Sequence, residues 1–367
     1  MGKTEAQLLV AMVLLTLLGF LCVYSTSFVL GYRLYGEPLA FLVRQLLGAG
    51  LGLALLVVFW RVNYHRWAEV DDLLLLGVFL LSLATLVPGV ARGGRWLRLG
   101  PFSFQPTELG KLALVLYLAS SLVRRGEEIH TFAQGIAPYL VVLGGFGLVF
   151  LLQPDLGMLV LYVTLTGFLL LVGGVPVRHL ALTALGGLPV GGLLVVAAPY
   201  RVGRLLAFLN PAAYQETYGY QVFQSLLAIG SGGLWGRGLG ASRAKLFYLP
   251  AVHNDFAFAA WAEETGLVGA LVVLGLLGWL VVLGLRVARS APDRLGTLYA
   301  LGASFVLGFQ SLVNLGVVVG VLPVTGLTLP FVSYGGSSLA VTLGLVGLLL
   351  GVARLAGQAT PQREEVA

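Results

Sequence analysis

Residues Ala257–Leu285, AFAAWAEETGLVGALVVLGLLGWLVVLGL, form one of ten apolar stretches that decide the fold of this 367-residue chain. A helix of roughly 20 apolar residues crosses the ~30 Å hydrocarbon core of a bilayer. The composition agrees, because 58% of the residues are hydrophobic, only 10% are charged and the mean hydropathy is +0.94. We therefore predict an integral membrane protein.

The predicted fold is all-α and polytopic, with ten transmembrane helices in a single integral membrane domain over residues 1–367. A large loop of about residues 199–256 separates the seventh and eighth helices, and a short tail of residues 356–367 ends the chain. We expect short helices and turns in the loop, resting on the membrane interface. The ten segments lie near residues 7–28, 40–60, 72–90, 107–123, 135–152, 157–175, 179–198, 257–285, 295–321 and 337–355.

The distribution of basic residues predicts the orientation. One set of short loops carries eight arginines, and by the positive-inside rule this side and both termini are cytoplasmic, which places the large loop outside. A cluster of Arg92, Arg95 and Arg98 on the other side opposes the rule, so we interpret it as functional. The eight arginines are Arg61, Arg66, Arg124, Arg125, Arg178, Arg286, Arg289 and Arg294.

Asp255 is the strongest candidate for a catalytic residue. It lies in Leu249–Phe256, LPAVHNDF, where the long polar loop returns to an apolar span. A carboxylate at such a place marks a reaction site more often than a structural one. Cys22, the only cysteine, excludes an intramolecular disulfide and a cysteine-rich metal site.

Glu108 and Lys111 are three residues apart at the start of the fourth span, so a helix places both on one face. Pro106 suits the first turn, with Ser103 or Thr107 as the cap. The pair either serves the site or only pins two helices together.

Three further polar segments are notable, and two of them also have a purely structural interpretation. Asp155, in Gln153–Gly157, either caps the sixth helix or belongs to the site. The stretch from Pro323 to Ser338 contains two prolines and several glycines, so it cannot be a continuous helix and must line protein or water. Glu263 and Glu264 either line a cavity or pair with Lys or Arg.

We expect these polar segments to converge on a cavity at the outer face that opens towards lipid. Arginine side chains and backbone amides bind phosphate, and a carboxylate handles a hydroxyl, so the cavity suits a substrate with an apolar tail and an anionic, sugar-like head. The candidate substrate-binding and catalytic residues are Arg95, Trp96, Glu108, Lys111, Asp155, Arg243, Lys245, His253, Asp255 and Ser333.

Five ordered motifs resemble the SEDS (shape, elongation, division and sporulation) family over nearly the whole chain. They are Gln105–Glu108 with Lys111, Gln153–Gly157, Gly219–Gly240, His253–Phe256 with Glu263–Gly266, and Leu329–Ser338. Members are ten-span polymerases that join lipid II units into peptidoglycan strands outside the cytoplasmic membrane of bacteria.

The resemblance implies a class B penicillin-binding protein and other cell-elongation proteins as partners, with membrane lipid around the protein and no nucleic acid. The elongation member RodA is favoured over the division member FtsW, partly because the tail after Arg354 is short. By family position, Asp255 matches the essential acid, and Glu108 and Lys111 match a functionally important ion pair. Ala251 departs from the family, because many relatives have Glu after the Leu-Pro.

We hypothesise that Asp255 is the general base for the acceptor 4-hydroxyl, with its pKa raised by the apolar surroundings of Phe256. Arg95 with Lys245 or Arg243, with or without a divalent cation (Mg²⁺ or Mn²⁺), would offset the charge of the departing pyrophosphate. No ligand spacing identifies a metal. A flippase for lipid-linked precursors and a non-catalytic scaffold are the alternatives; a flippase needs a path open to both faces.

Overall fold

The computed structural model describes residues 2–99, 102–210 and 213–364. Each of the ten predicted segments coincides with a helix over most of its length. These are α1 (Lys3–Tyr35), α2 (Ala40–Arg61), α3 (Trp67–Ala84), α4 (Pro106–Arg125), α6 (Ala137–Leu152), α7 (Leu156–Val172), α8 (Val177–Val196), α11 (Ala257–Ser290), α12 (Arg294–Val318) and α13 (Gly336–Glu364).

Shorter elements connect these helices. The long loop contains two short α-helices and one short π-helix, in agreement with the predicted short helices and turns. The second of the two α-helices ends at Gly232, in a glycine turn. The connecting helices are η1 (Tyr64–Arg66), η2 (Gly126–His130), α5 (Phe132–Gly135), α9 (Pro199–Leu209), α10 (Tyr220–Gly232) and η3 (Ala244–Tyr248).

A small antiparallel sheet between α3 and α4 was not predicted. Its strands are β1 (Ala91–Arg92), β2 (Trp96–Leu99) and β3 (Phe102–Phe104), in the order β1-β2-β3. The sequence signal is weak because the strands are only two to four residues long, and short-range pairing rather than periodicity defines them. The sheet fixes the backbone at Arg95 and Trp96.

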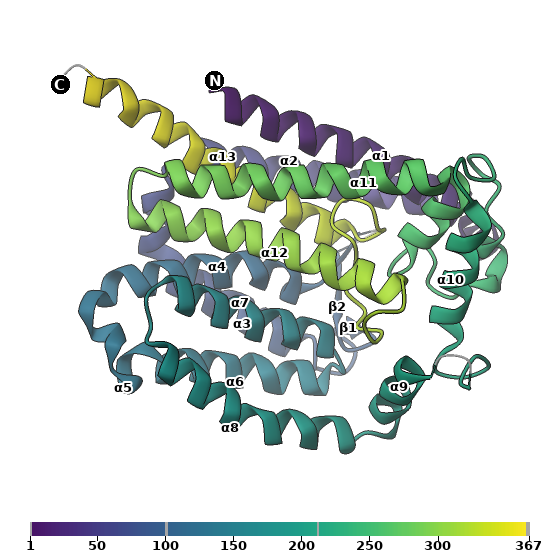
Figure 1. Cartoon of the computed structure of the whole chain (residues 1–367), viewed down its shortest axis with the longest axis horizontal. Helices are drawn as coiled ribbons and strands as arrows, with labels where there is room; N and C mark the ends of the chain where they lie inside the picture. Colours follow the sequence, from purple (N-terminus) through teal and green to yellow (C-terminus); the bar gives the residue numbers. More distant parts are fainter. Residues whose placement is uncertain (1, 100–101, 211–212, 365–367) are drawn as a thin grey trace.

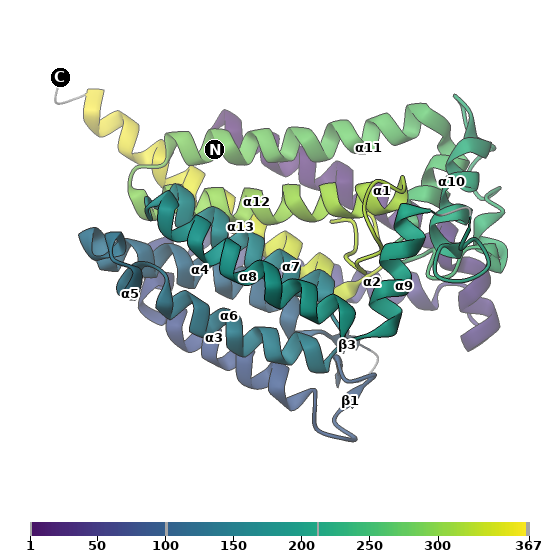
Figure 2. The ribbon, with the colours of Figure 1, turned by 60° about the horizontal axis from the view of Figure 1, so that its bottom comes forward.

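The long helices lie side by side, and the two ends of the bundle differ (Figure 1). The N- and C-termini lie at one end, whereas α9, α10, the sheet and the segment between α12 and α13 lie at the other. A second view shows β1, β3 and α9 at that same end (Figure 2). The predicted site motifs are therefore gathered at the end of the bundle away from the termini.

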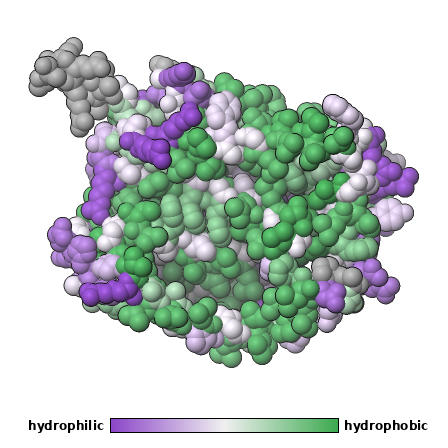
Figure 3. All heavy atoms as spheres, in the orientation of Figure 1, coloured by the Kyte–Doolittle hydropathy of each residue, from purple (hydrophilic) through white to green (hydrophobic). Residues whose placement is uncertain are grey.

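The protein is a mostly helical, polytopic membrane protein. Eight helical segments of the described chain are long and apolar enough to span a bilayer. Among the other two predicted spans, α7 is apolar but has 17 residues, and α3 carries Glu69, Asp71 and Asp72 near its start. Apolar residues cover most of the face in Figure 3, with hydrophilic residues gathered towards the two ends. The ten crossings stay a prediction.

Two predicted boundaries are corrected. The third segment was placed near 72–90, but α3 begins at Trp67 and ends at Ala84, because the polar first turns are also helical. The predicted tail of residues 356–367 is mostly a continuation of α13, which runs to Glu364. Residues 365–367 of that tail lie outside the described residues.

Helices α2 and α13 pack closely along much of their length, and glycines make this possible. A Cβ at Gly48 would lie 2.5 Å from the Cα of Gly336, and a Cβ at Gly347 would lie 2.6 Å from the carbonyl oxygen of Leu56. Small residues let two helix backbones approach closely in a membrane, where van der Waals packing replaces the hydrophobic effect. This contact places the start of α13 beside the first turns of α2.

We predict that Gly48→Ala destabilises the protein by about 1–3 kcal/mol, because the added methyl overpacks the α2–α13 contact. Gly50→Ala is the matched control on the same helix, since a Cβ there meets no atom within 4 Å. Thermal unfolding of both variants in detergent, followed by circular dichroism, measures the difference. Equal melting temperatures for the two variants would contradict the packing argument.

Candidate active site

A polar pocket of about 590 Å³ lies where the ends of α1, α2 and α13, the small sheet and the loop before α11 meet. Of the predicted site residues, three line it: Arg95, Trp96 and His253. The full lining is Tyr35, Phe41, Arg44, Gly93, Arg95, Trp96, Ser103, His253, Asn254, Tyr334, Gly335 and Gly336.

Asp255 lies directly after two of the lining residues, on the loop that leads into α11. The side-chain amide of Asn314, on α12, donates to the backbone carbonyl of Asp255 at 2.8 Å and fixes the loop. Within the described chain the Asp255 carboxyl accepts no hydrogen bond, so it is free to take one from a substrate. The carboxyl is held in place by its backbone and not by side-chain partners.

The electrostatic surroundings of Asp255 suit a general base. Burial raises the pKa of Asp255 to about 6, and the nearby carboxylate of Asp155 acts in the same direction. The guanidinium groups of Arg204 and Arg95 oppose this rise. The group is therefore ionised at neutral pH but more basic than an ordinary aspartate, as the apolar sequence around it predicts.

Asp155 both caps a helix and belongs to the neighbourhood of Asp255. Its Oδ1 accepts from the Met158 amide at 3.2 Å at the start of α7, which confirms the predicted cap. Its other oxygen lies 3.5 Å from the Arg95 guanidinium. Arg95 also donates to the carbonyls of Gln153 and Pro154. Burial raises the pKa of Asp155.

The predicted ion pair between Glu108 and Lys111 is present and buried. Lys111 Nζ also donates to Gln310 Oε1 at 2.8 Å, and the Gln310 amide donates to the Thr328 carbonyl at 2.8 Å. The pair thus joins α4, through α12, to the segment between α12 and α13. Neither residue lines the pocket, so the geometry favours the interpretation that the pair pins the surrounding elements.

The predicted cap of α4 is wrong. Gln105 occupies the N-cap position and no side chain accepts a hydrogen bond there; Thr107 lies inside the first turn, and its hydroxyl has no partner within the described residues. Pro106 does occupy the first turn as predicted. The side-chain amide of Gln105 donates to Oδ2 of Asp155 at 3.2 Å and fixes the start of α4.

The segment between α12 and α13 is non-helical, as its prolines predict, and Ser333 has a structural position in it. The Ser333 hydroxyl accepts from the Leu329 amide at 3.0 Å and does not line the pocket. Gln45, on α2, is fully buried and bonds the Ser333 carbonyl at 3.3 Å and the Gly335 amide at 3.0 Å. The Tyr334 amide donates to the His253 carbonyl at 2.8 Å, which ties the two pocket loops together.

His253 contributes an apolar, neutral wall. Its ring packs edge-on against Phe41, with ring centroids 5.0 Å apart, and lies near Tyr334. Burial lowers the pKa of His253 to about 4, so the ring is uncharged at neutral pH. It cannot hold an anion by charge.

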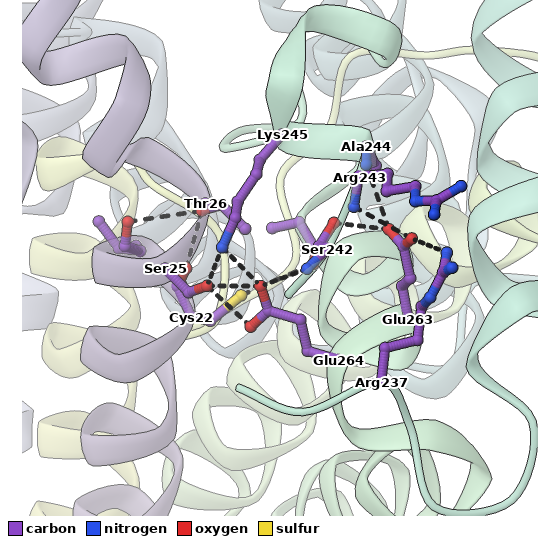
Figure 4. Close-up of polar contacts among 12 residues, drawn as sticks. Cys22, Ser25, Thr26, Arg237, Ser242, Arg243, Ala244, Lys245, Glu263 and Glu264 are labelled. Atoms are coloured by element: carbon purple, nitrogen blue, oxygen red, sulfur yellow. Dashed lines mark hydrogen bonds and ion pairs between the residues drawn. The ribbon is translucent and has the colours of Figure 1, made fainter. Parts of the chain in front are cut away.

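Arg243 and Lys245 do not line this pocket. Lys245 pairs with Glu264 at 3.0 Å and contacts Ser25 on α1, and the backbone amide of Arg243 donates to Glu263 at 3.1 Å (Figure 4). Glu263 also forms an ion pair with Arg237 at 3.2 Å. Both glutamates therefore pair with basic side chains, which is the second of the two alternatives drawn from the sequence. The spacing of basic residues along the sequence does not show which of them line the pocket, so Arg243 and Lys245 could not be excluded.

Sequence reasoning missed two cationic residues. Arg44 lines the pocket, and its guanidinium lies 4.2 Å from the centroid of the Tyr35 ring. Arg204, on α9, acts on Asp255 electrostatically and donates to the Val324 carbonyl at 3.3 Å. The signal for Arg44 was present, because a charged residue inside a predicted span is functional by default.

The residues do not form a preassembled metal site. No group of three or more His, Cys, Asp or Glu side chains in the part of the chain that the structure describes is placed to hold an ion. Asp155 and Asp255 are two carboxylates close enough to interact electrostatically. Mg²⁺ is commonly held by one or two carboxylates together with substrate phosphates.

Known proteins resemble this chain over nearly its whole length. The family model described as "Cell cycle protein" (FtsW/RodA/SpoVE) matches residues 6–358. The chain belongs to this family. It is 40% identical to a probable peptidoglycan glycosyltransferase FtsW of Geobacter sp. (strain M18), covering 95% of this chain and 96% of that protein. It is likewise 40% identical to stage V sporulation protein E of Bacillus subtilis, covering 96% and 98%.

Solved structures agree with the sequence relatives. A chain from a peptidoglycan synthase complex that coordinates polymerization and crosslinking matches with a TM-score of 0.76 and 34% identity, covering 96% of this chain and 98% of that one. RodA of Thermus thermophilus matches with a TM-score of 0.67 and 33% identity, covering 95% of each chain. The SEDS resemblance and the predicted enzyme class, a peptidoglycan glycosyltransferase of the bacterial cytoplasmic membrane, are confirmed.

We predict that the Asp255 carboxyl titrates with a midpoint near pH 6, which infrared difference spectroscopy of the protonated carboxyl band measures. Arg204→Gln is expected to move the midpoint upward, because Arg204 favours the ionised form. Asp255→Asn is the control that identifies the band. A midpoint at the ordinary aspartate value of about 4 would mean that burial does not act on this group.

Proposed function

We propose that this protein is a peptidoglycan polymerase that joins lipid II units into glycan strands at the outer face of the membrane during cell elongation. The single integral membrane domain of residues 1–367 then has ten crossings, with both termini cytoplasmic and the loop of about residues 199–256 outside. The termini at one end of the bundle and the pocket at the other support this orientation. The elongation role rests on the likeness to RodA of Thermus thermophilus.

The observation that carries the proposal is the carboxylate of Asp255, which has a raised pKa and no hydrogen-bond partner among the described residues and lies beside a polar pocket that two guanidinium groups line. In the proposed step, Asp255 takes the proton from the acceptor 4-hydroxyl as its oxygen attacks the anomeric carbon of the donor sugar. The bond from that carbon to the diphosphate oxygen breaks, and the diphosphate leaves with the electron pair.

The leaving diphosphate needs positive charge. Arg95 and Arg44 both line the pocket, and their guanidinium groups can form paired hydrogen bonds to phosphate oxygens. A divalent cation (Mg²⁺ or Mn²⁺) held by the diphosphate and the carboxylate of Asp155 would supply further charge neutralisation and leave Asp255 available as the base. Arg95 is preorganised for this role because Asp155 and two backbone carbonyls fix its position.

The proposed partners are a class B penicillin-binding protein, which crosslinks the strands, and other cell-elongation proteins. The similar chain in a synthase complex that coordinates polymerization and crosslinking supports this pairing. Lipid II enters from the membrane, so the apolar helix faces around the pocket receive its tail.

We predict that Asp255→Asn lowers the rate of lipid II polymerisation about 10²- to 10⁴-fold, because a positioned general base contributes that much. The assay uses the purified protein with its cognate penicillin-binding protein and follows strand length on gels. Asp72→Asn is the matched control, since Asp72 is largely exposed and does not line the pocket.

A near-normal rate for Asp255→Asn would remove the proposed base. Strand formation by neither the native protein nor the Asp72→Asn control, together with protein-dependent movement of lipid II across vesicles, would favour the flippase.

We predict that Arg44→Gln slows polymerisation at least about 10-fold, since hydrogen bonds to charged groups are worth about 1.5–3 kcal/mol. Arg33→Gln, which removes an exposed arginine outside the pocket, is the control. Chelation of divalent ions tests whether a metal cation also neutralises the departing diphosphate. Full activity after chelation would exclude the cation and leave Arg44 and Arg95 as the source of neutralisation.

A further inference from the structure

A second groove, of about 330 Å³, lies between α10, η3 and α11 and shares no lining residue with the pocket beside Asp255. It carries two arginines, three amide or hydroxyl side chains and one buried carboxylate. Its lining is Gln224, Leu227, Ala228, Ser231, Arg237, Arg243, Ala244, Tyr248 and Glu263. The proposed polymerase chemistry does not use this groove.

Two consecutive glutamates of α11 build the groove by holding the preceding loop (Figure 4). Glu263 accepts from the Ser242 hydroxyl at 2.6 Å and from the backbone amides of Arg243 and Ala244 at 3.1 and 3.2 Å. Glu264, on the other side, pairs with Lys245 at 3.0 Å. The backbone at residue 243 is therefore fixed, and its side chain starts from a rigid position.

The two arginines of the groove differ in their partners. Arg237 lies 3.2 Å from Glu263 and is partly neutralised by it. The Arg243 side chain makes no ion pair or hydrogen bond within the described residues, and neither does the Gln224 side chain. Figure 4 shows both guanidinium groups beside Glu263, on the side away from Lys245. One cation, Arg243, is left to bind an anion.

The end of α10 does not oppose an anion here. Helix C-terminal carbonyls normally favour cations. The carbonyls of Gly232 and Gly233, however, already accept from the amides of Gly236 and Leu267 at 2.8 and 2.9 Å. Arg243 therefore faces little competition from backbone oxygens.

Apolar side chains surround this cationic groove. Leu227 and Tyr248 line it and are 52% and 58% exposed, and Leu234 and Trp235, just beyond α10, are 62% and 80% exposed. Exposed aromatic and leucine side chains beside arginine are typical of surfaces that rest in the headgroup region of a bilayer. The groove thus offers a charged centre with an apolar rim.

We propose that this groove binds the phosphate of an anionic amphiphile, with Arg243 as the principal cation, Arg237 and Gln224 as further donors, and Leu227 and Tyr248 contacting the apolar part. Two sources share that chemistry: a membrane phospholipid such as phosphatidylglycerol, and a polyprenyl phosphate. The site binds without turnover, so it does not depend on the proposed polymerase activity.

Native mass spectrometry of the full-length protein in neutral detergent tests the proposal, with short-chain phosphatidylglycerol and farnesyl phosphate titrated separately. Arg243→Gln is expected to weaken binding of at least one probe about 10-fold, the loss of one hydrogen bond to a charged group. Arg243→Lys should keep part of the affinity. Arg33→Gln is the control, because it removes an exposed arginine that lines neither pocket.

An Arg243-dependent loss for phosphatidylglycerol identifies a phospholipid site, and a loss confined to farnesyl phosphate identifies a site for polyprenyl phosphate. Equal affinities of the native, Arg243→Gln and Arg33→Gln proteins for both probes would overturn the proposal. Circular dichroism confirms folding of each variant; the Glu263 contact is made by the Arg243 backbone and survives the substitution. The Asp255→Asn variant should bind both probes normally, which separates this site from the failure or success of the catalytic proposal.

Discussion

The need to pair charge in an apolar bundle governs the end of this protein where the pockets lie. A buried ion costs several kcal/mol unless it is paired and hydrogen-bonded. Glu108 pairs with Lys111 on the same helix, and Lys111 also reaches Gln310 on α12. Glu263 pairs with Arg237 and Glu264 with Lys245, and these two pairs join the long loop to α11. The same pairs therefore neutralise charge and set the positions of the loops.

Asp255 differs from those carboxylates. Asp155 keeps a contact with Arg95, whereas Asp255 receives only longer-range effects of Arg95 and Arg204 and makes no side-chain hydrogen bond in the described chain. Its backbone is nevertheless fixed by Asn314, whose amide also bonds the Leu327 carbonyl at 2.7 Å. A rigid backbone with an uncommitted carboxyl is the arrangement that general-base chemistry requires, because the proton acceptor stays available without being mobile.

Polar residues on two long helices hold the segment between α12 and α13 in place. Gln45 on α2, and Gln310 and Asn314 on α12, bond backbone groups of the segment between α12 and α13. Non-helical backbone at the edge of a bilayer needs such partners, because lipid cannot satisfy its amides and carbonyls. The pocket wall that Tyr334, Gly335 and Gly336 form is consequently supported from behind by the helical scaffold.

The sequence by itself determined the helical segments, the polar interruption after α12, the pair of Glu108 with Lys111 and the cap at Asp155, since each depends on residues that are near one another along the chain. The length of a hydrophobic run predicts a membrane helix, and a spacing of three residues predicts that two side chains share one face of it. It also pointed to Asp255, because a carboxylate between a polar loop and an apolar span is rare.

Only the tertiary structure decided which distant residues meet. It brought Arg44 into the pocket, kept Arg243 and Lys245 out of it by their contacts with Glu263 and Glu264, and buried Ser333 behind the wall. The small sheet at Arg95 also escaped prediction. These outcomes depend on long-range ion pairs and backbone hydrogen bonds, and the spacing of residues within one segment carries no record of the partner that another segment will supply.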